Sequence, residues 1–104
     1  MDEVVLKNLK EPFIRLKELV KMNGGKHYRI QISIIENIVD CINSDLSDNE
    51  KSEYVIRNYK NLFPPNGGLS DFYIHHDSYD EQIKLNKPLD EINDKLWSII
   101  KKYI

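Results

Sequence analysis

Of all the short runs in this chain, His75-His76-Asp77 looks most like a metal-binding or acid–base site. Imidazole and carboxylate groups are common ligands of zinc and other first-row metals. In an extended segment, however, adjacent side chains point to opposite faces, so His75 and His76 do not readily share one ion. A site built from His27, His75 and Asp77 is geometrically possible, but no motif spacing supports it. We expect exposed polar residues and no metal or other cofactor; the alternative is a small metal-binding protein or hydrolase that uses this run with Asp71.

Two other features could carry chemistry, and neither has the necessary surroundings. Cys41 is the single cysteine, so it cannot form an internal disulfide or a paired metal site. It lies among isoleucines in an apolar helical pattern, which favours a buried, inert thiol over a nucleophile. The glycine-rich run 66–68 lacks the helix start of a phosphate-binding loop, because aromatic residues and an aspartate follow it. The sequence therefore predicts no catalytic residue and a protein that is not an enzyme.

The stretch 62–74 combines residues that constrain the backbone with bulky apolar side chains. Two prolines fix φ and two glycines permit positive φ, and aromatic residues follow at once, so we expect an ordered loop. Asp71 is expected to accept hydrogen bonds from amides of the turn. The residues predicted to build this structural loop are Phe63, Gly67, Gly68, Leu69 and Asp71.

Acidic residues alternate with tyrosines and histidines directly after the loop. Carboxylates steer the approach of a basic partner, and tyrosine rings supply buried contact area. We predict that this stretch contacts a basic protein partner, with two tyrosines as anchors. Its members are Asp71, Tyr73, His75, Asp77, Tyr79, Asp80 and Glu81. The alternative surface is the polar face of the helix predicted over 47–62, which carries Glu50, Glu53 and Arg57.

Four segments with apolar residues repeating every three and four positions predict the helices that position these loops. The first runs from about Asp2 to Met22, and Pro12 within it predicts a kink or a break. Asn23-Gly24-Gly25 supplies a left-handed stop. The second runs over about 26–43, where length and period favour a helix although its β-branched residues also suit a strand. Its expected buried stripe is Tyr28, Ile32, Ile35, Val39, Ile42 and Leu46.

The third and fourth helices are predicted from their start signals. Ser47-Asp48-Asn49-Glu50 is a capping box, which predicts a helix to about Leu62. Pro88 suits the first position of the last helix, so residues 78–85 are expected to lie outside it. The apolar positions of the third helix are Tyr54, Val55, Asn58 and Leu62, and those of the last are Leu89, Ile92, Leu96, Ile99 and Tyr103, flanked by Trp97 and Ile100.

Length and composition agree with one all-α domain over residues 1–104. The chain has 104 residues, 40% of them hydrophobic, and a net charge of −2, so it lacks the basic footprint of a nucleic-acid-binding protein. No apolar run approaches the roughly 20 residues of a membrane-spanning helix. The acidic start does not resemble a secretory signal, so we expect a cytoplasmic protein. We expect four helices packed as a small bundle, with the loop and residues 71–74 lying across one end.

From the glycine pair at 24–25 to its C-terminus, the chain resembles a family of small, uncharacterised bacterial helical proteins. The hallmark of that family is a Phe-Gly-Gly-Met-Gly-Ser-Phe-Asn-Asp-Leu-like loop between the last two helices. The matching positions are Phe63, Gly67, Leu69, Asp71 and Phe72, followed by Tyr73-Ile74 and a final helix that opens near Asn86. The chain departs from the pattern at Pro64-Pro65-Asn66 and at Gly68.

The resemblance implies a function by association. Some proteins of this kind look like immunity proteins, which neutralise antibacterial toxins by covering their active surfaces. The resemblance transfers no catalytic residue. It implies a bacterial, cytoplasmic toxin inhibitor, and the partner would be a basic toxin domain because toxins that act on nucleic acids need positive surfaces to hold phosphates. A further alternative is a phage or regulatory protein that acts through homo-oligomerisation of the last helix.

Overall fold

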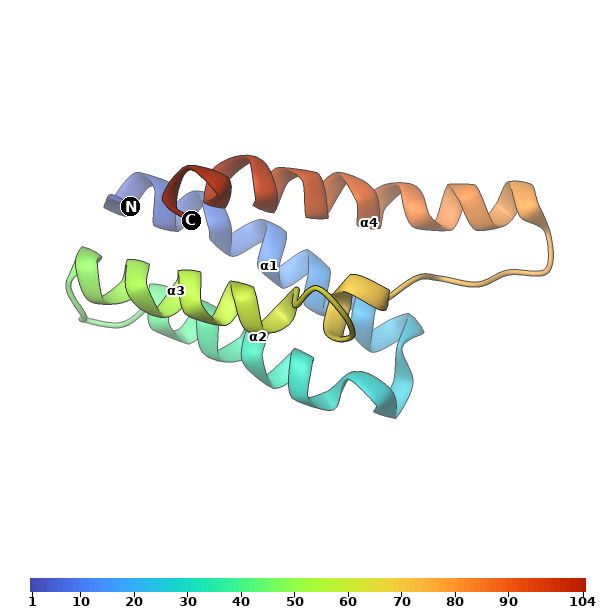
Figure 1. The fold of residues 1–104 in the computed structure, drawn as a ribbon, viewed down its shortest axis with the longest axis horizontal. Coiled ribbons are helices and arrows are strands. Elements are labelled where there is room, and N and C mark those ends of the chain that lie inside the picture. Colours follow the sequence, from blue (N-terminus) through green and yellow to red (C-terminus); the bar gives the residue numbers. More distant parts are fainter.

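The computed structural model describes residues 1–104 and contains four α-helices and no β-strand (Figure 1). The helices are α1 Glu3–Asn23, α2 Arg29–Ile42, α3 Asp48–Leu62 and α4 Tyr79–Ile100. Three short 3-10 helices join or extend them: η1 Gly25–Tyr28, η2 Gly68–Asp71 and η3 Lys101–Tyr103. The predicted all-α fold with four principal helices is confirmed. No helix has both the length and the apolar content to cross a membrane.

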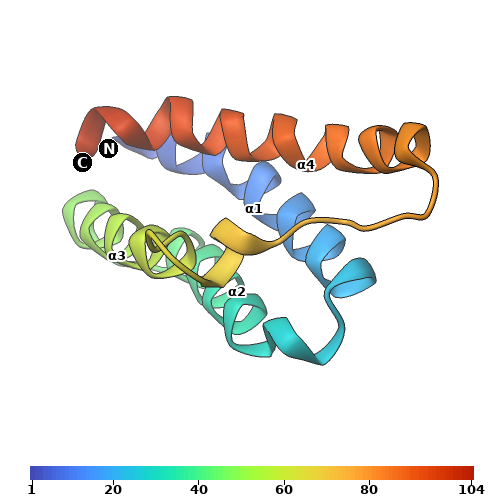
Figure 2. The same ribbon diagram turned by 45° about the vertical axis from the view of Figure 1, so that its right-hand side comes forward.

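The helices pack as two pairs, α1 with α4 and α2 with α3, and α1 also packs closely against α2 (Figures 1 and 2). By contrast, α3 and α4 make almost no direct contact with each other. The molecule is elongated, with extents of 47 × 25 × 23 Å. Its core draws on every α-helix and on residues 69–74, with Phe13 as its largest fully buried side chain. The side between α3 and α4 therefore stays open.

Helix α1 is continuous through Pro12, so of the two predicted outcomes, a kink or a break, the break does not occur. Asp2 caps the helix, because its carboxylate accepts a hydrogen bond of 2.9 Å from the amide of Val5. Proline removes the bond that its amide would donate to the carbonyl of Asn8, and Asn8 is exposed, so water can satisfy that oxygen. Pro12 itself is buried and lines a small hollow between α1 and α4.

The turn after α1 contains the left-handed residue that Asn23-Gly24-Gly25 predicts. Gly24 ends the helix in a right-handed conformation, and the left-handed residue is Gly25, with φ of 57°. Residues 25–28 form a 3-10 turn, so α2 starts later than predicted. The buried face of α2 is rotated slightly from the predicted stripe, since Ile38 is fully buried while Val39 is half-buried; Leu46, predicted on the stripe, is exposed and lies beyond the end of the helix.

Helix α3 confirms the predicted start and end. The hydroxyl of Ser47 accepts from the amide of Glu50 at 3.2 Å, and the carboxylate of Glu50 accepts from the amide of Ser47 at 3.3 Å. Its buried face holds Tyr59 where Asn58 was predicted. The face shifted because a tyrosine ring buries more apolar area than an amide side chain.

Helix α4 begins at Tyr79 and runs through Pro88, so the predicted start near Pro88 is wrong. Ser78 caps the helix, with its hydroxyl accepting from the amide of Glu81 at 3.4 Å. Ser78 and Glu81 have the same spacing as the capping box that opens α3, and this signal predicts the true start. Pro88 removes only the bond to the carbonyl of Lys84, an exposed residue.

Candidate functional site

Residues 63–71 form the ordered turn that the sequence predicts. Gly67 has φ of 84° and ψ of −165°, a region that only glycine occupies readily, and Gly68 has φ of 56°. The Asp71 carboxylate accepts a 2.9 Å bond from the amide of Gly67, which confirms its predicted structural role. Leu69 is buried, and the ring of Phe63 packs 5.0 Å from that of Tyr59. The turn therefore has a fixed shape.

Residues 72–78, which we call the extended segment, run lengthwise toward the start of α4 and not across one end of the bundle as predicted (Figures 1 and 2). Phe72 packs edge-on against Tyr28, with ring centroids 5.1 Å apart. A Cβ on Gly24 would lie 3.3 Å from the Phe72 ring and 2.7 Å from that of Tyr28. The glycine therefore makes room for this aromatic pair.

Asn86 of α4 holds the extended segment in place. Its side-chain oxygen accepts a 2.9 Å bond from the amide of Ile74, and its Nδ2 donates to the Ile74 carbonyl at 2.7 Å. The same nitrogen donates to the carbonyl of Gln82 at 2.8 Å. Asn86 is only 2% exposed, so one buried amide takes the place of a neighbouring strand for Ile74.

The residues predicted to bind a partner do not lie together. Tyr73 is 43% exposed and packs edge-on against His75, with ring centroids 5.6 Å apart. Asp77 lies at the far end of the extended segment. Tyr79, Asp80 and Glu81 occupy the first turn of α4, where Tyr79 is 74% exposed. The structure thus divides the predicted stretch between a central part and a distant end.

The largest hollow of the molecule is a groove of about 420 Å³ on the open side between α3 and α4. Its first wall comes from α3, η2 and the extended segment and includes Tyr59, Phe63, Phe72 and Tyr73. Its second wall comes from α4 and includes the half-exposed ring of Trp97. Burial raises the pKa of the Tyr59 phenol, so this residue stays neutral at physiological pH. Aromatic rings make up five of the seven hydrophobic residues that line the groove.

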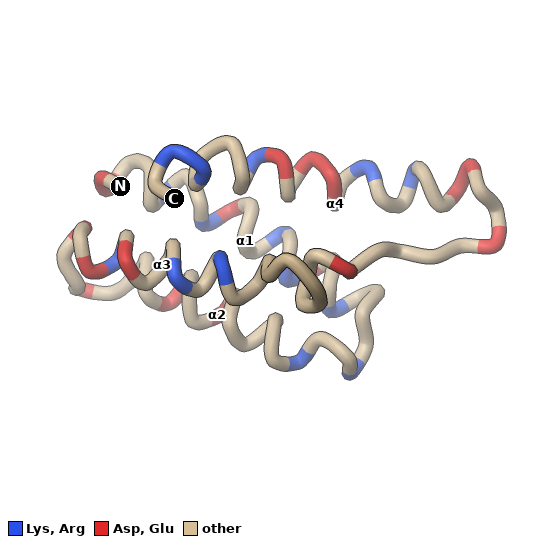
Figure 3. The backbone as a smooth tube through the Cα atoms, viewed as in Figure 1, with Lys and Arg blue, Asp and Glu red and all other residues tan.

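The α4 wall also carries two acids, Asp90 and Asp94, one helical turn apart. Neither carboxylate has an ion-pair partner, because the two salt bridges of the molecule join Glu3 to Lys7 and Glu81 to Lys84. Elsewhere, acidic and basic positions are interspersed along the helices (Figure 3). The groove therefore pairs an aromatic surface with an unneutralised negative edge.

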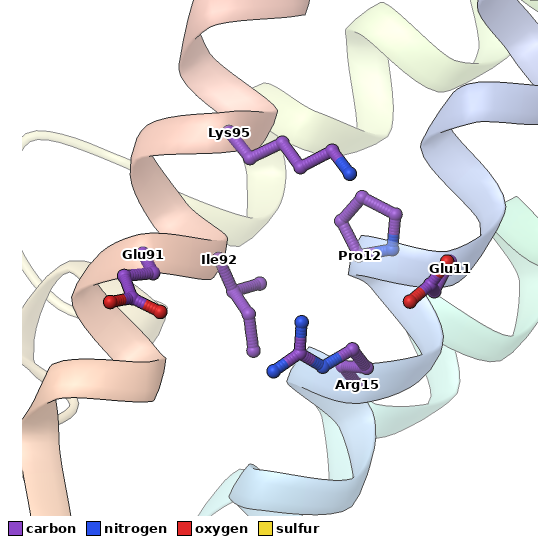
Figure 4. Close-up of a pocket in the computed structure, with 6 residues that line it drawn as sticks. All are labelled: Glu11, Pro12, Arg15, Glu91, Ile92 and Lys95. Atoms are coloured by element: carbon purple, nitrogen blue, oxygen red, sulfur yellow. The ribbon is translucent and has the colours of Figure 1, made fainter.

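A smaller hollow of about 190 Å³ lies between α1 and α4 (Figure 4). Arg15 and Lys95 extend into the space between the two helices, over Pro12 and Ile92, and a glutamate lies on each helix beside them. Two cations and two carboxylates leave no net charge, and one of the six lining residues is hydrophobic. The hollow between α1 and α4 therefore offers a ligand fewer hydrophobic side chains and less net charge than the groove does.

The hydrogen bonds of His76 and the burial of Cys41 indicate structural roles for these residues. The Nδ1 of His76 accepts a 2.9 Å bond from the amide of Ser78, and the amide of His76 donates to the side-chain oxygen of Gln82 at 3.1 Å. No group of three or more histidine, cysteine, aspartate or glutamate residues is placed to hold a metal ion. Burial raises the pKa of the Cys41 thiol, and nearby Lys51 lowers it to a smaller extent. Cys41 is therefore protonated at neutral pH and a poor nucleophile.

Sequence reasoning missed the role of four α4 residues, namely Asn86, Asp90, Asp94 and Trp97. The last three share one helical face, since they lie at spacings of four and three. A tryptophan beside two acids on one face was a usable signal for a surface. Asn86 gave no such signal, because its partner is a backbone group twelve residues away.

Comparison of the chain with models of protein families, with curated proteins and with solved structures gives no match. The site has to be interpreted from its own geometry.

Proposed function

We propose that this chain is a protein-binding protein of the immunity type, a cytoplasmic bacterial inhibitor that neutralises a toxin by covering its active surface. The observation that carries the proposal is the aromatic groove between α3 and α4. Tryptophan and tyrosine are enriched among the residues that dominate binding energy at protein interfaces, and they act best where a pocket excludes water. A rigid groove lined by such rings supports recognition of a protein partner.

The charge of the surface supports a basic partner. Asp90 and Asp94 border the groove without ion pairs. Asp77, Asp80 and Glu81 add exposed acids toward the start of α4. Complementary charge speeds association and disfavours acidic partners. Toxin domains that act on nucleic acids carry positive surfaces to hold phosphates, so they meet this requirement.

The proposal is tested by co-expression in bacteria with the products of neighbouring genes. We expect one neighbour to arrest growth alone and to be neutralised by this protein. The two purified proteins should then form a stable complex in size-exclusion chromatography with light scattering. If no toxic neighbour is neutralised, the immunity assignment is wrong.

Matched variants locate the contact surface. Removing the two half-exposed groove rings, by Tyr73→Ala with Trp97→Ala, should weaken the complex by about thirtyfold or more, as for interface hot spots. Ile30→Ala is the control, because Ile30 is 72% exposed on α2 and does not line the groove. If Tyr79→Ala abolishes binding while the groove variant does not, the contact lies at the start of α4.

A further inference from the structure

The groove presents aromatic faces on one wall and hydrogen-bond acceptors on the other. The acceptors come from three α4 residues, Asp90, Asn93 and Asp94. The side-chain oxygen of Asn93 is buried and has no hydrogen-bond partner. Buried polar atoms without a partner are rare, because each costs free energy that a donor would recover. The acceptors that a ligand in the groove can reach are the exposed carboxylates of Asp90 and Asp94, so a ligand that suits this wall brings donors.

The two carboxylates favour a positively charged ligand. Asp90 and Asp94 lie at positions i and i+4 of one helix, where like charges repel, and no lysine or arginine neutralises either of them. A cation placed beside both carboxylates would remove this repulsion. Both carboxylates are exposed, so this attraction is that of a surface pair and weakens as the salt concentration rises.

The aromatic residues distinguish between the two basic side chains. A guanidinium group is planar, stacks on aromatic faces and carries five donors with no acceptor. An ammonium group is more strongly hydrated and presents a point charge, so it gains less from a flat aromatic surface. Tyr73 and Trp97, the half-exposed rings of the two walls, offer such surfaces.

We infer that the groove is a receptor for an arginine side chain of the partner, whose guanidinium stacks on Tyr73 or Trp97 and donates to Asp90 and Asp94. This inference rests on the proposed function in one respect, namely that the partner is a protein. It adds the chemistry that the partner must present, which is an exposed arginine on a protruding loop or terminus.

The test uses short peptides, so it does not require the toxin. Capped Gly-Gly-Arg-Gly-Gly is titrated into the intact, isotope-labelled protein, and lysine and citrulline versions of the peptide serve as comparisons. Trp97 is the only tryptophan, so its fluorescence and its indole N–H resonance report on the groove directly. We expect saturable changes at Trp97 and at the side-chain amide of Asn93, strongest with arginine, weaker with lysine and weakest with the neutral citrulline.

A pair of matched charge variants provides the second part of this test. Asp90→Asn with Asp94→Asn should weaken arginine-peptide binding by about tenfold, as expected for the loss of charge-assisted hydrogen bonds. Asp80→Asn with Glu81→Gln removes the same charge from the first turn of the same helix, outside the groove, and should change affinity less than about twofold, as for a distant, screened pair.

Four results would overturn the inference. They are equal binding of the citrulline peptide, equal loss in both charge variants, no saturable change at Trp97, and a dimer of this chain whose interface covers the groove. If the peptide binds but no toxin is neutralised, the arginine receptor stands and the immunity function is wrong. If neutralisation survives Asp90→Asn with Asp94→Asn unchanged, the function stands and the receptor is wrong.

Discussion

The connection between α3 and α4 consists of two parts that are held by different means. The turn, residues 63–71, is held by side-chain hydrogen bonds within itself: the Asp71 carboxylate accepts from the amide of Gly67, and the hydroxyl of Ser70 donates to the carbonyl of Pro64 at 2.6 Å. The extended segment, residues 72–78, depends on α4, because Asn86 binds both backbone groups of Ile74 and Gln82 binds the amide of His76.

This difference separates a structure that neighbouring residues maintain from one that depends on contacts with another helix. Glycine, proline and an aspartate four residues away favour this turn through local backbone preferences and a local hydrogen bond, and buried Leu69 anchors it to the core. An extended segment without a neighbouring strand needs side chains from another element to pair its buried backbone. Substitutions in the turn should therefore act locally, whereas one substitution in α4 should release the extended segment.

The largest effect is expected from Asn86→Leu. It leaves the buried amide and carbonyl of Ile74 without partners, and each such group costs about 1–3 kcal/mol, so we expect a loss of about 3 kcal/mol or more in the free energy of unfolding. Urea denaturation, monitored by circular dichroism, measures this loss in the free energy of unfolding.

The control for this prediction is Asn86→Asp, which keeps an acceptor for the Ile74 amide and removes the donor to its carbonyl. Its buried carboxylate would face the carbonyl oxygens of Ile74 and Gln82, so this variant should also be destabilised at neutral pH and should regain stability at acidic pH, where the protonated acid can donate. A leucine variant as stable as the original protein would show that the extended segment does not depend on Asn86.

The next largest effect is expected from Gly68→Ala, at about 2–3 kcal/mol, in the range for strained backbone plus a close contact. Gly68 has φ of 56°, and an added Cβ would lie 2.8 Å from the carbonyl oxygen of Leu62 and 2.9 Å from Cδ of Pro64. Gly67→Ala meets no atom within 4 Å and is strained through its φ of 84° alone, so it should cost less, about 1–2 kcal/mol. Thermal melting of the two variants tests this ranking, and the reverse order would contradict the turn geometry.

Asp71→Ala should lower the free energy of unfolding by about 1 kcal/mol, the usual value of one hydrogen bond, because its carboxylate is exposed and holds the single amide of Gly67. Asp71→Asn retains an acceptor oxygen and should recover most of the loss. The effect should stay within the turn, so amide exchange at Ile74 should not change. Faster exchange at Ile74 would show that the two parts are coupled.

Gln82→Ala should have the smallest effect on stability, below about 1 kcal/mol, since its bond to the amide of His76 is exposed. It should nevertheless speed hydrogen exchange at that amide several-fold. Exchange at Ile74 provides the internal control, because Asn86 protects it independently.

The comparison also explains which features the sequence could predict. The α3 capping box, the positive φ of Gly67 and Gly68 and the bond from Gly67 to Asp71 depend on residues within a few positions of each other, and the structure confirms all of them. The start of α4 was misplaced because Pro88 looked like a first residue, although Ser78 and Glu81 carry a cap signal.

The groove could not be predicted in the same way, because it depends on which helices pack together. Periodicity identifies the apolar face of a helix and does not state its neighbour. The groove exists because α3 packs on α2 and α4 packs on α1, which leaves Tyr59 and Trp97 on opposite walls of an open side. The clamp formed by Asn86 depends on the same arrangement.

The position of Asn86 along α4 has a consequence for the entropy of binding. Residues 75–85 lie between Ile74 and Asn86, outside the hydrogen bonds that join these two residues, and all of them are exposed except the half-buried Gln82. A helical turn without buried apolar contacts unfolds locally at little cost. A partner that binds Tyr79 must therefore order an exposed end of the helix and loses affinity in doing so, whereas a partner that enters the groove meets a floor of buried side chains, Tyr59, Leu69 and Phe72, that the core already holds.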